Sequence, residues 1–475
     1  MTPGANDLCV FAVKRGNTKK RFDVDYCLHG KLIKLNSTYT IVKFGELIED
    51  IYRYPTFYNI KYVSNGIGVI KGENIARSGE WVKINDLGFI DKETNNRFLR
   101  TVLQKNDLVM TVRGEVGKTG LVTEQLAGCN ISGNVIKIRL KKYWNDVEIA
   151  PNYVWEYLNS ALGKALIKKQ ISGGVQETIT VADISDIDII LPDTLLQEEL
   201  ARDIGQKRVY INKKLNHANG LLLGHTNMVL DRLGLCFDRE GQVLCHSIRL
   251  CDITARLDVD YYTPKFESFR KQIERSFYPS TEIGAICNRI VTGFAAGKQD
   301  QADDLPDDQR VAQLRPFSIT PEGELSFETK KYVPKDRLKS EDYCQKGEVI
   351  FNNTNSPDLV GKTTVFDQDV LCATSNHMTR ITVKDGVNPY YVAAFFNVLL
   401  SIGYWKLLCT NFNNQAGINI ETLKKVRIPL PDKSIQDEIA AEIMRRRSQA
   451  NELRKEAAKE WAEAKAQFEK ELLGE

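Results

Sequence analysis

Several side chains in this sequence could contact the bases and phosphates of a nucleic acid. Asn352, Asn353 and Asn355 lie close together, and a carboxamide can form paired hydrogen bonds with adenine. Arg113 occupies a similar place in an earlier segment, and a guanidinium can do the same with guanine. The asparagines could equally bond within their own loop. Four cations suited to phosphates and one polar candidate complete the set: Lys71, Lys118, Arg315, Lys362 and His377.

Motifs for other chemistry are incomplete. Gly114-Glu-Val-Gly-Lys-Thr119 is similar to a phosphate-binding P-loop, but it has two residues before Gly-Lys instead of four and no following helix pattern. Asn388-Pro-Tyr-Tyr391 lacks the second proline of the adenine-methyltransferase tetrapeptide. The five histidines form no metal-ligand pair and the 10 cysteines form no Cys-x-x-Cys pair. We therefore predict no catalytic site, no metal site and no cofactor on this chain.

The sequence contains an internal duplication with a period of roughly 240 residues. Arg21-Phe-Asp-Val-Asp-Tyr26 recurs as Arg256-Leu-Asp-Val-Asp-Tyr261, and Gly117-Lys-Thr119 recurs as Gly361-Lys-Thr363. The longest match aligns residues 178–204 with 417–443. The matches keep the same order along the chain, so we interpret them as a duplicated domain, with loop insertions between them.

Each copy predicts the same series of elements. Short Val- and Ile-rich segments at 108–112, 120–122 and 135–139 predict strands, as do 348–351, 364–366 and 380–383 in the second copy. An amphipathic helix is expected near 152–169 and near 390–408. A strand ending in Leu-Pro-Asp follows, and a long helix begins there.

The two long helices are expected to pair. Asp193 and Asp432 stand where N-caps should, and Thr194-Leu-Leu-Gln197 fits a capping box. Apolar residues repeat every seven positions at Ile204, Ile211 and Ala218, and a similar seam follows Ile439. We expect an antiparallel coiled coil, with a kink allowed at Gly220 and Gly224; packing of each helix on its own domain alone is the alternative.

The bulk composition excludes some classes of protein. The net charge is +3, which is weak support for nucleic-acid binding. No run of 18 apolar residues predicts a membrane span, and the N-terminus has no signal-peptide pattern. Scattered cysteines favour reduced thiols. We expect a cytoplasmic protein with no membrane association.

The repeated motifs resemble those of the specificity subunits of type I restriction–modification systems, and the resemblance covers nearly the whole chain. The segments that carry it are Phe351–Lys362, Asn414–Asp432 with Gln436, Arg256–Pro264 and, more loosely, Asp107–Lys118 and Ile184–Gln197. The resemblance implies an α+β fold: two β-rich target-recognition domains, separated by two long antiparallel coiled-coil helices, in a pseudo-two-fold repeat. The expected boundaries are 1–193 and 238–432 for these domains, and 194–237 and 433–475 for the helices.

The resemblance also implies partners. Double-stranded DNA would be the ligand, and two modification (methyltransferase) subunits and restriction (motor-nuclease) subunits would join the chain. S-adenosylmethionine, ATP and Mg²⁺ would be cofactors of those subunits. A helix over residues 195–235 would be about 60 Å long, so two reading domains held apart by it would recognise a bipartite site with an unread spacer. Because the two copies have diverged, the half-sites should differ.

Three other functions stay open. The chain could be the separate specificity partner of a two-part type II-like restriction–modification enzyme. It could be a nuclease with dispersed acidic residues, which predicts metal-dependent cleavage by the purified chain. It could also be a coiled-coil scaffold, which predicts no sequence preference on DNA.

Overall fold

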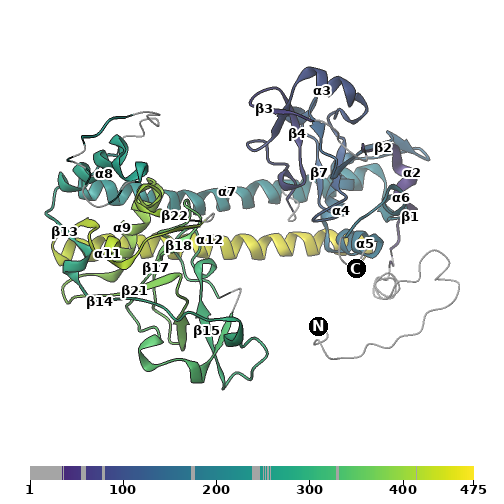
Figure 1. Ribbon diagram of the computed structural model, residues 1–475. Coiled ribbons are helices and arrows are strands. Elements are labelled where there is room, and N and C mark those ends of the chain that lie inside the picture. Colours follow the sequence, from purple (N-terminus) through teal and green to yellow (C-terminus); the bar gives the residue numbers. More distant parts are fainter. Residues whose placement is uncertain are drawn as a thin grey trace. The chain divides into compact units, whose positions relative to one another are not determined.

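The computed structural model describes residues 35, 37–54, 60–76, 81–172, 177–237, 246–249, 251, 253, 256, 258–327, 331–412 and 415–474 (Figure 1). The chain divides into two compact units, one made of Met1–Lys214 with Lys455–Glu475 and the other of Leu215–Arg454. Each unit thus combines one β-rich body with one half of each long helix, whereas the sequence had suggested that the helices form segments of their own. The first copy of the repeat motif, residues 21–26, lies outside the described residues.

The first body is built on two sheets. One has the order β2-β9-β6-β7 (Ile48–Tyr52, Val135–Leu140, Leu108–Thr111 and Thr119–Leu121). The other has the order β3-β5-β4-β8 (Tyr62–Val63, Gly88–Ile90, Ile67–Ile70 and Asn130–Ile131). An antiparallel pair of β1 (Thr40–Lys43) and β12 (Asp188–Leu191) leads to the long helix, and a β10–β11 hairpin (Tyr143–Trp144, Val147–Glu148) is added at the side.

The second body repeats this plan. Its main sheet has the order β14-β21-β17-β19 (Cys287–Thr292, Met378–Val383, Val349–Asn352 and Thr363–Val365). Its smaller sheet has the order β16-β15-β20 (Tyr332–Pro334, Arg310–Leu314 and Cys372–Thr374). The pair β13–β24 (Ser280–Glu282, Arg427–Pro429) precedes the second long helix.

The two bodies agree in topological detail. The smaller sheets each contain one parallel pair, β4 with β8 and β15 with β20. The first strand of each main sheet is irregular at the same point, between Ile48 and Asp50 in β2 and between Cys287 and Arg289 in β14. These shared irregularities confirm the duplication predicted from the sequence, because a bulge changes register and is not expected twice by chance.

A helical layer covers each main sheet. In the first body α4 (Pro151–Asn159) is followed by α5 (Ala161–Gln170), and in the second α9 (Pro389–Ser401) is followed by α10 (Tyr404–Leu408). The sequence predicted one helix in each place. The first is interrupted because Ser160 caps a new helix, and the second because Gly403 adopts a left-handed conformation. Two short helices, α6 (Val181–Ser185) and α11 (Ile420–Lys424), come next.

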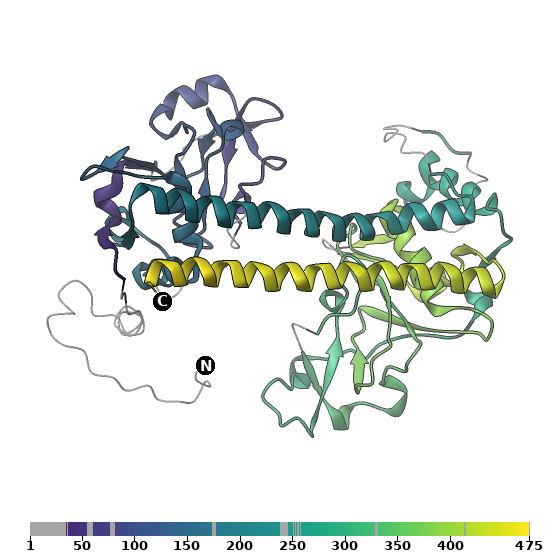
Figure 2. The ribbon, with the colours of Figure 1, turned by 180° about the vertical axis from the view of Figure 1, so that it is seen from behind.

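The long helices α7 (Thr194–Leu233) and α12 (Lys433–Leu473) are unbroken (Figure 2). They begin at the residues predicted from the sequence, and the side chain of Asp193 accepts a hydrogen bond from the backbone of Leu196 as an N-cap. The kink that Gly220 and Gly224 would permit does not occur, because α7 is one helix throughout. Gly224 lies close to α12, where its carbonyl accepts a hydrogen bond from Arg446. Gly234, with φ +65°, ends α7.

Within each unit the two helix halves run antiparallel. In the first unit Ile204 of α7 shares a core with Phe468 of α12, while Lys214, further along α7, pairs with Glu460 at 2.8 Å. In the second unit the predicted seam is buried at Ala218 and Ala450, and small side chains there allow close approach. The coiled-coil prediction is confirmed within both units.

Candidate nucleic-acid interface

The repeated Gly-Lys-Thr motif forms a tight turn in both bodies. Gly117 has φ +86° and Gly361 has φ +99°, a region that favours glycine. A Cβ atom on Gly117 would collide with Ile167 of α5, and one on Gly361 would collide with Trp405 of α10. The motif therefore joins the main sheet to the helical layer, and its resemblance to a P-loop is explained by packing.

The lysines of this motif bind the protein itself. Lys362 is 6% exposed, and its Nζ donates to the carbonyl oxygens of Pro316 (2.8 Å) and Ile319 (2.6 Å). Burial lowers the pKa of Lys362. Lys118 pairs with Glu115 at 2.9 Å. A phosphate contact by Lys362 does not fit this placement, and the expectation is corrected: its ammonium holds the loop that follows β15.

Two of the three asparagines are also internal. Asn352 is fully buried at the end of β17, where its Nδ2 donates to the carbonyl of Leu359. Asn353 is 4% exposed and donates to Thr379 Oγ1 at 2.9 Å. Base contacts by these two side chains do not fit the structure, because they support their own loop. Asn355 is half-buried and accepts a hydrogen bond from the backbone of Ser356.

The remaining candidates lie nearer the surface, and a DNA contact by them stays a prediction. Lys71 lies 3.4 Å from Glu73 and above the ring of Tyr62. Arg315 is half-buried and donates to Gln313. Arg113 is exposed. The imidazole of His377 is half-buried.

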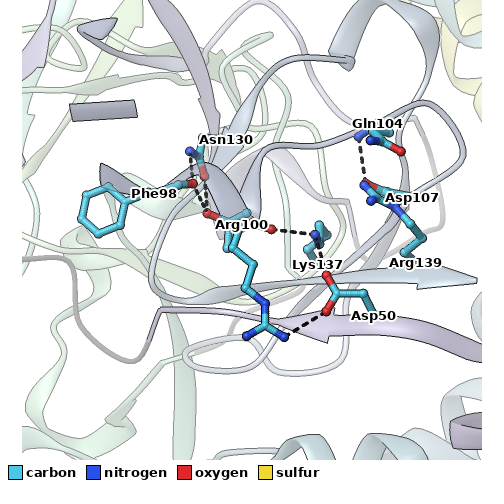
Figure 3. Close-up of polar contacts among 9 residues, drawn as sticks. Asp50, Phe98, Arg100, Gln104, Asp107, Asn130, Lys137 and Arg139 are labelled. Carbon is cyan, nitrogen blue, oxygen red and sulfur yellow. Dashed lines mark hydrogen bonds and ion pairs between the residues drawn. The ribbon is translucent and has the colours of Figure 1, made fainter. Parts of the chain in front are cut away.

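A polar network that the sequence analysis missed crosses the main sheet of the first body (Figure 3). Lys137, which is 3% exposed on β9, binds Asp50 of β2 at 2.8 Å and the carbonyl of Arg100 at 2.6 Å. The guanidinium of Arg100 also binds Asp50. Burial alone would raise the pKa of Asp50, but hydrogen bonds from Lys137 and Arg100 outweigh it and lower the pKa. The network ties a loop to the sheet.

A second ion pair in Figure 3 joins β9 to the residue that precedes β6. Arg139 makes two parallel hydrogen bonds of 2.8 Å to the buried carboxylate of Asp107, which also accepts from the backbone of Gln104. In the second body Glu348 takes the place of Asp107 and accepts from the backbone of Gln345 at 2.9 Å. Alternating Lys and Arg on a strand, in Val-Ile-Lys-Ile-Arg139, was the available signal.

The second body keeps a buried cation on its central strand as well. Arg380 on β21 is 1% exposed and donates to the backbone carbonyls of Tyr343 and Glu341. Lys137 and Arg380 therefore play matching structural roles with different chemistry. Neither lies in an open site, so we assign these networks to the scaffold.

A small three-stranded ribbon carries exposed residues that the sequence analysis did not select. In the second body β18 (Thr354–Asn355), β23 (Gln415–Gly417) and β22 (Thr410–Phe412) form this ribbon, and every residue of β22 is exposed. In the first body single bridges join Arg113 to Thr178 and Thr178 to Ser172. The signal available in the sequence was an aromatic residue among amides, in Asn411-Phe412-Asn-Asn-Gln415.

Among the described residues, no group of three or more His, Cys, Asp or Glu side chains could hold a metal ion. Within that same part of the chain, no helix is both long and apolar enough to cross a membrane.

The chain is similar to known proteins over part of its length. Residues 319–460 match the family model described as type I restriction modification DNA specificity domain. The type I restriction enzyme EcoBI specificity subunit of Escherichia coli is 26% identical over 178 residues, which are 38% of this chain and 36% of that protein. The chain thus spans about a third of the length of this curated relative, and its match to the specificity family model lies within residues 319–460.

Solved structures are also similar to this chain, at low sequence identity. A chain from a structure of the complex assembly and conformational transition of the type I R-M system is 15% identical, with 93% of this chain and 98% of that chain covered and a TM-score of 0.49. The type I restriction-modification system S subunit from M. genitalium is 11% identical, with coverage of 92% and 97% and a TM-score of 0.43. Likenesses of this size assign nothing by themselves.

Proposed function

We propose that this chain is the DNA sequence-specificity subunit of a type I restriction–modification complex. The observation that carries the proposal is the repeated body: two copies of one topology, joined to the same pair of long helices, in a chain whose residues 319–460 match the specificity family model. A duplicated binding domain suits a ligand that is contacted at two places, and a bipartite DNA site is such a ligand.

The differences between the bodies support an asymmetric site. The scaffold is repeated, but the first body adds the β10–β11 hairpin and the second forms the full β18–β23–β22 ribbon. Two different surfaces on one scaffold would recognise two different half-sites. The exposed Arg113 in the first body and the half-buried Asn355 in the second would contact bases.

The proposed role is recognition without catalysis. Modification and restriction subunits would carry the reactions, with S-adenosylmethionine, ATP and Mg²⁺ bound to them and not to this chain. The specificity subunit would direct these partners to the recognised site. We place the complex in the cytoplasm, where chromosomal DNA of a bacterial or archaeal cell is accessible.

The decisive experiment is the methylome of cells that carry this chain with its neighbouring genes. We expect a split, asymmetric methylated motif that disappears when the chain is deleted. Replacement of residues 238–430 by the second body of another family member should change one half of that motif only. A single unbroken motif, or methylation that survives the deletion, would refute the proposal.

A further inference from the structure

We propose that the β22–β23 hairpin of the second body enters the major groove of duplex DNA, with Phe412 and Gln415 as its base-contacting residues. In the first body Arg113 bridges to Thr178 as Thr354 of β18 pairs with Gly417, and we propose this exposed arginine as the base-contacting residue there. This inference rests on the proposed function and adds to it the element of the second body that reads its half-site.

The hairpin has the shape that this role requires. A two-stranded β-ribbon fits the major groove of B-DNA. Thr410, Asn411 and Phe412 are all exposed, so β22 is an open edge of the ribbon. Phe412 is opposite Gln415 in the antiparallel register, so their side chains share one face. That face is free on the described part of the body, since Phe412 is 48% exposed and Gln415 is exposed.

The residue types suit base edges. A glutamine amide can donate to and accept from adenine, and an aromatic ring can contact the methyl group of thymine. The segment from Cys409 to Asn419 contains no carboxylate, so the hairpin brings no charge that phosphates would repel.

The hairpin is anchored at its base by Arg256, the first residue of the repeated motif Arg256–Tyr261. Arg256 makes paired hydrogen bonds of 2.8 and 2.6 Å to Asp258. The same guanidinium donates to the carbonyl of Leu408 at 2.6 Å and to that of Cys409 at 3.3 Å, immediately before β22. The Arg-x-Asp motif thus fixes the direction in which the hairpin leaves the body.

The internal repeat gives independent support. In the second body Gly417 pairs with Thr354 on one side and Thr410 on the other. In the first body Thr178 pairs with Arg113 and Ser172 in the same way. The position is therefore repeated, while the residues that surround it are not.

An element that reads a half-site should differ between the two bodies, while the scaffold that holds it should be the same. Tyr153 and Tyr391 donate to equivalent strand carbonyls, those of Ile190 and Pro429, at the same distance of 2.6 Å. Structure that holds the body together is thus kept in both copies, and the ribbon differs. Two bodies that share a scaffold and differ at this position match two unlike half-sites.

Two arginines lie near the matching bridges of the first body. Arg53 donates to the carbonyl of Gly133, and its pKa is lowered by burial and by the nearby charge of Arg113. Two guanidinium groups that repel each other across this surface would both gain from a polyanion or from the acceptor atoms of guanine.

The test selects duplex DNA from a random library with the full chain bound to its methyltransferase partner. The variant is Phe412→Ala/Gln415→Ala. Its matched control is Gln368→Ala/Val370→Ala, which also removes one exposed glutamine and one exposed apolar side chain of the same body. We expect the variant to lose sequence preference in one half of the site and to bind the original site at least about 10-fold more weakly. Arg113→Ala should affect the other half only.

The outcomes separate the two proposals. If the unaltered complex selects no split motif, the proposed function is wrong. If it selects one and the ribbon variant selects the same motif with the affinity of the control, the ribbon assignment alone is wrong. If the variant still recognises the half-site of the first body, the protein has folded. A loss confined to the half-site of the second body therefore supports the assignment.

Discussion

The side-chain oxygen of Gln436 accepts a hydrogen bond from the backbone N–H of Asn388 at 2.9 Å, and its Nε2 donates to the carbonyl of Pro431 at 2.8 Å. Gln197 accepts in the same way from the backbone of Ala150 at 3.0 Å. Each glutamine joins the start of a long helix to the start of the helical layer. The spacing of Thr194 and Gln197 had suggested a capping box. The side chain of Gln197 instead makes this link to Ala150.

Loss of this link should destabilise the second unit. Gln436→Ala would leave the N–H of Asn388 and the carbonyl of Pro431 without partners in a buried place, since Gln436 is 2% exposed. We expect the free energy of unfolding to fall by about 1–3 kcal/mol. Urea denaturation followed by circular dichroism measures it. The exposed Gln449→Ala on the same helix is the control, and an equal effect of both substitutions would contradict the assigned role.

A buried ion pair holds the first unit in a comparable place. Arg208 of α7 binds Glu156 of α4, and both side chains are 3% exposed. The guanidinium also lies 4.4 Å from the ring centre of Trp155 and 4.7 Å from that of Trp461. Burial raises the pKa of Glu156, and Arg208 opposes that rise.

Removal of the arginine alone should therefore be severe. Arg208→Ala leaves a buried carboxylate without its cation, and we expect a loss of about 3–5 kcal/mol in the free energy of unfolding. Arg202→Ala, at an exposed site of the same helix, should change little. The double variant Arg208→Met/Glu156→Leu should recover part of the loss because it removes both charges. If the double variant were as unstable as Arg208→Ala, the buried charge would not be the cause.

The periodic features of this chain could be predicted from its sequence, for a physical reason. Duplication, strand segments and long helices are recorded in local patterns of apolar residues, so α7 and α12 begin at the expected Thr194 and Lys433. The seam residues Ile211 and Ala457 are buried as their spacing required.

The direction of polar side chains could not be predicted, because it depends on contacts far apart in sequence. Lys362 binds a carbonyl that lies 43 residues away in the chain, and Asn353 binds a hydroxyl 26 residues away. No local pattern separates such side chains from surface residues of the same type. The repeat offers one further signal, because Thr178 and Gly417 occupy equivalent positions in the two bodies.

The turn at Gly361 should tolerate no side chain. Its φ of +99° disfavours other residues by about 1–2 kcal/mol, and a methyl group would collide with Trp405. Gly347 has a similar φ of +91° but open space around it. We expect Gly361→Ala to cost at least about 1 kcal/mol more than Gly347→Ala in thermal or urea unfolding. Equal costs would show that conformation alone requires the glycine.

His225 of α7 is poised to make the second unit sensitive to acid. Its Nε2 is buried and has no hydrogen-bond partner among the described residues. Burial, together with the charges of Arg447 and Arg446, lowers the pKa of His225 from 6.5 to about 4, although Glu442 opposes this shift. Between these two pKa values the unfolded chain binds a proton at this histidine and the folded chain does not.

Stability should therefore fall as the pH is lowered from 7 through 6.5 toward 4, because protons favour the state that binds more of them. His225→Asn removes the titrating group, so its loss of stability between pH 7 and pH 5 should be smaller than that of the unaltered protein. Urea midpoints at the two pH values measure the difference, and His217→Asn, at an exposed site of the same helix, should keep the original dependence. An unchanged pH dependence in His225→Asn would mean that this imidazole is protonated in the folded protein and that its burial does not exclude the charge.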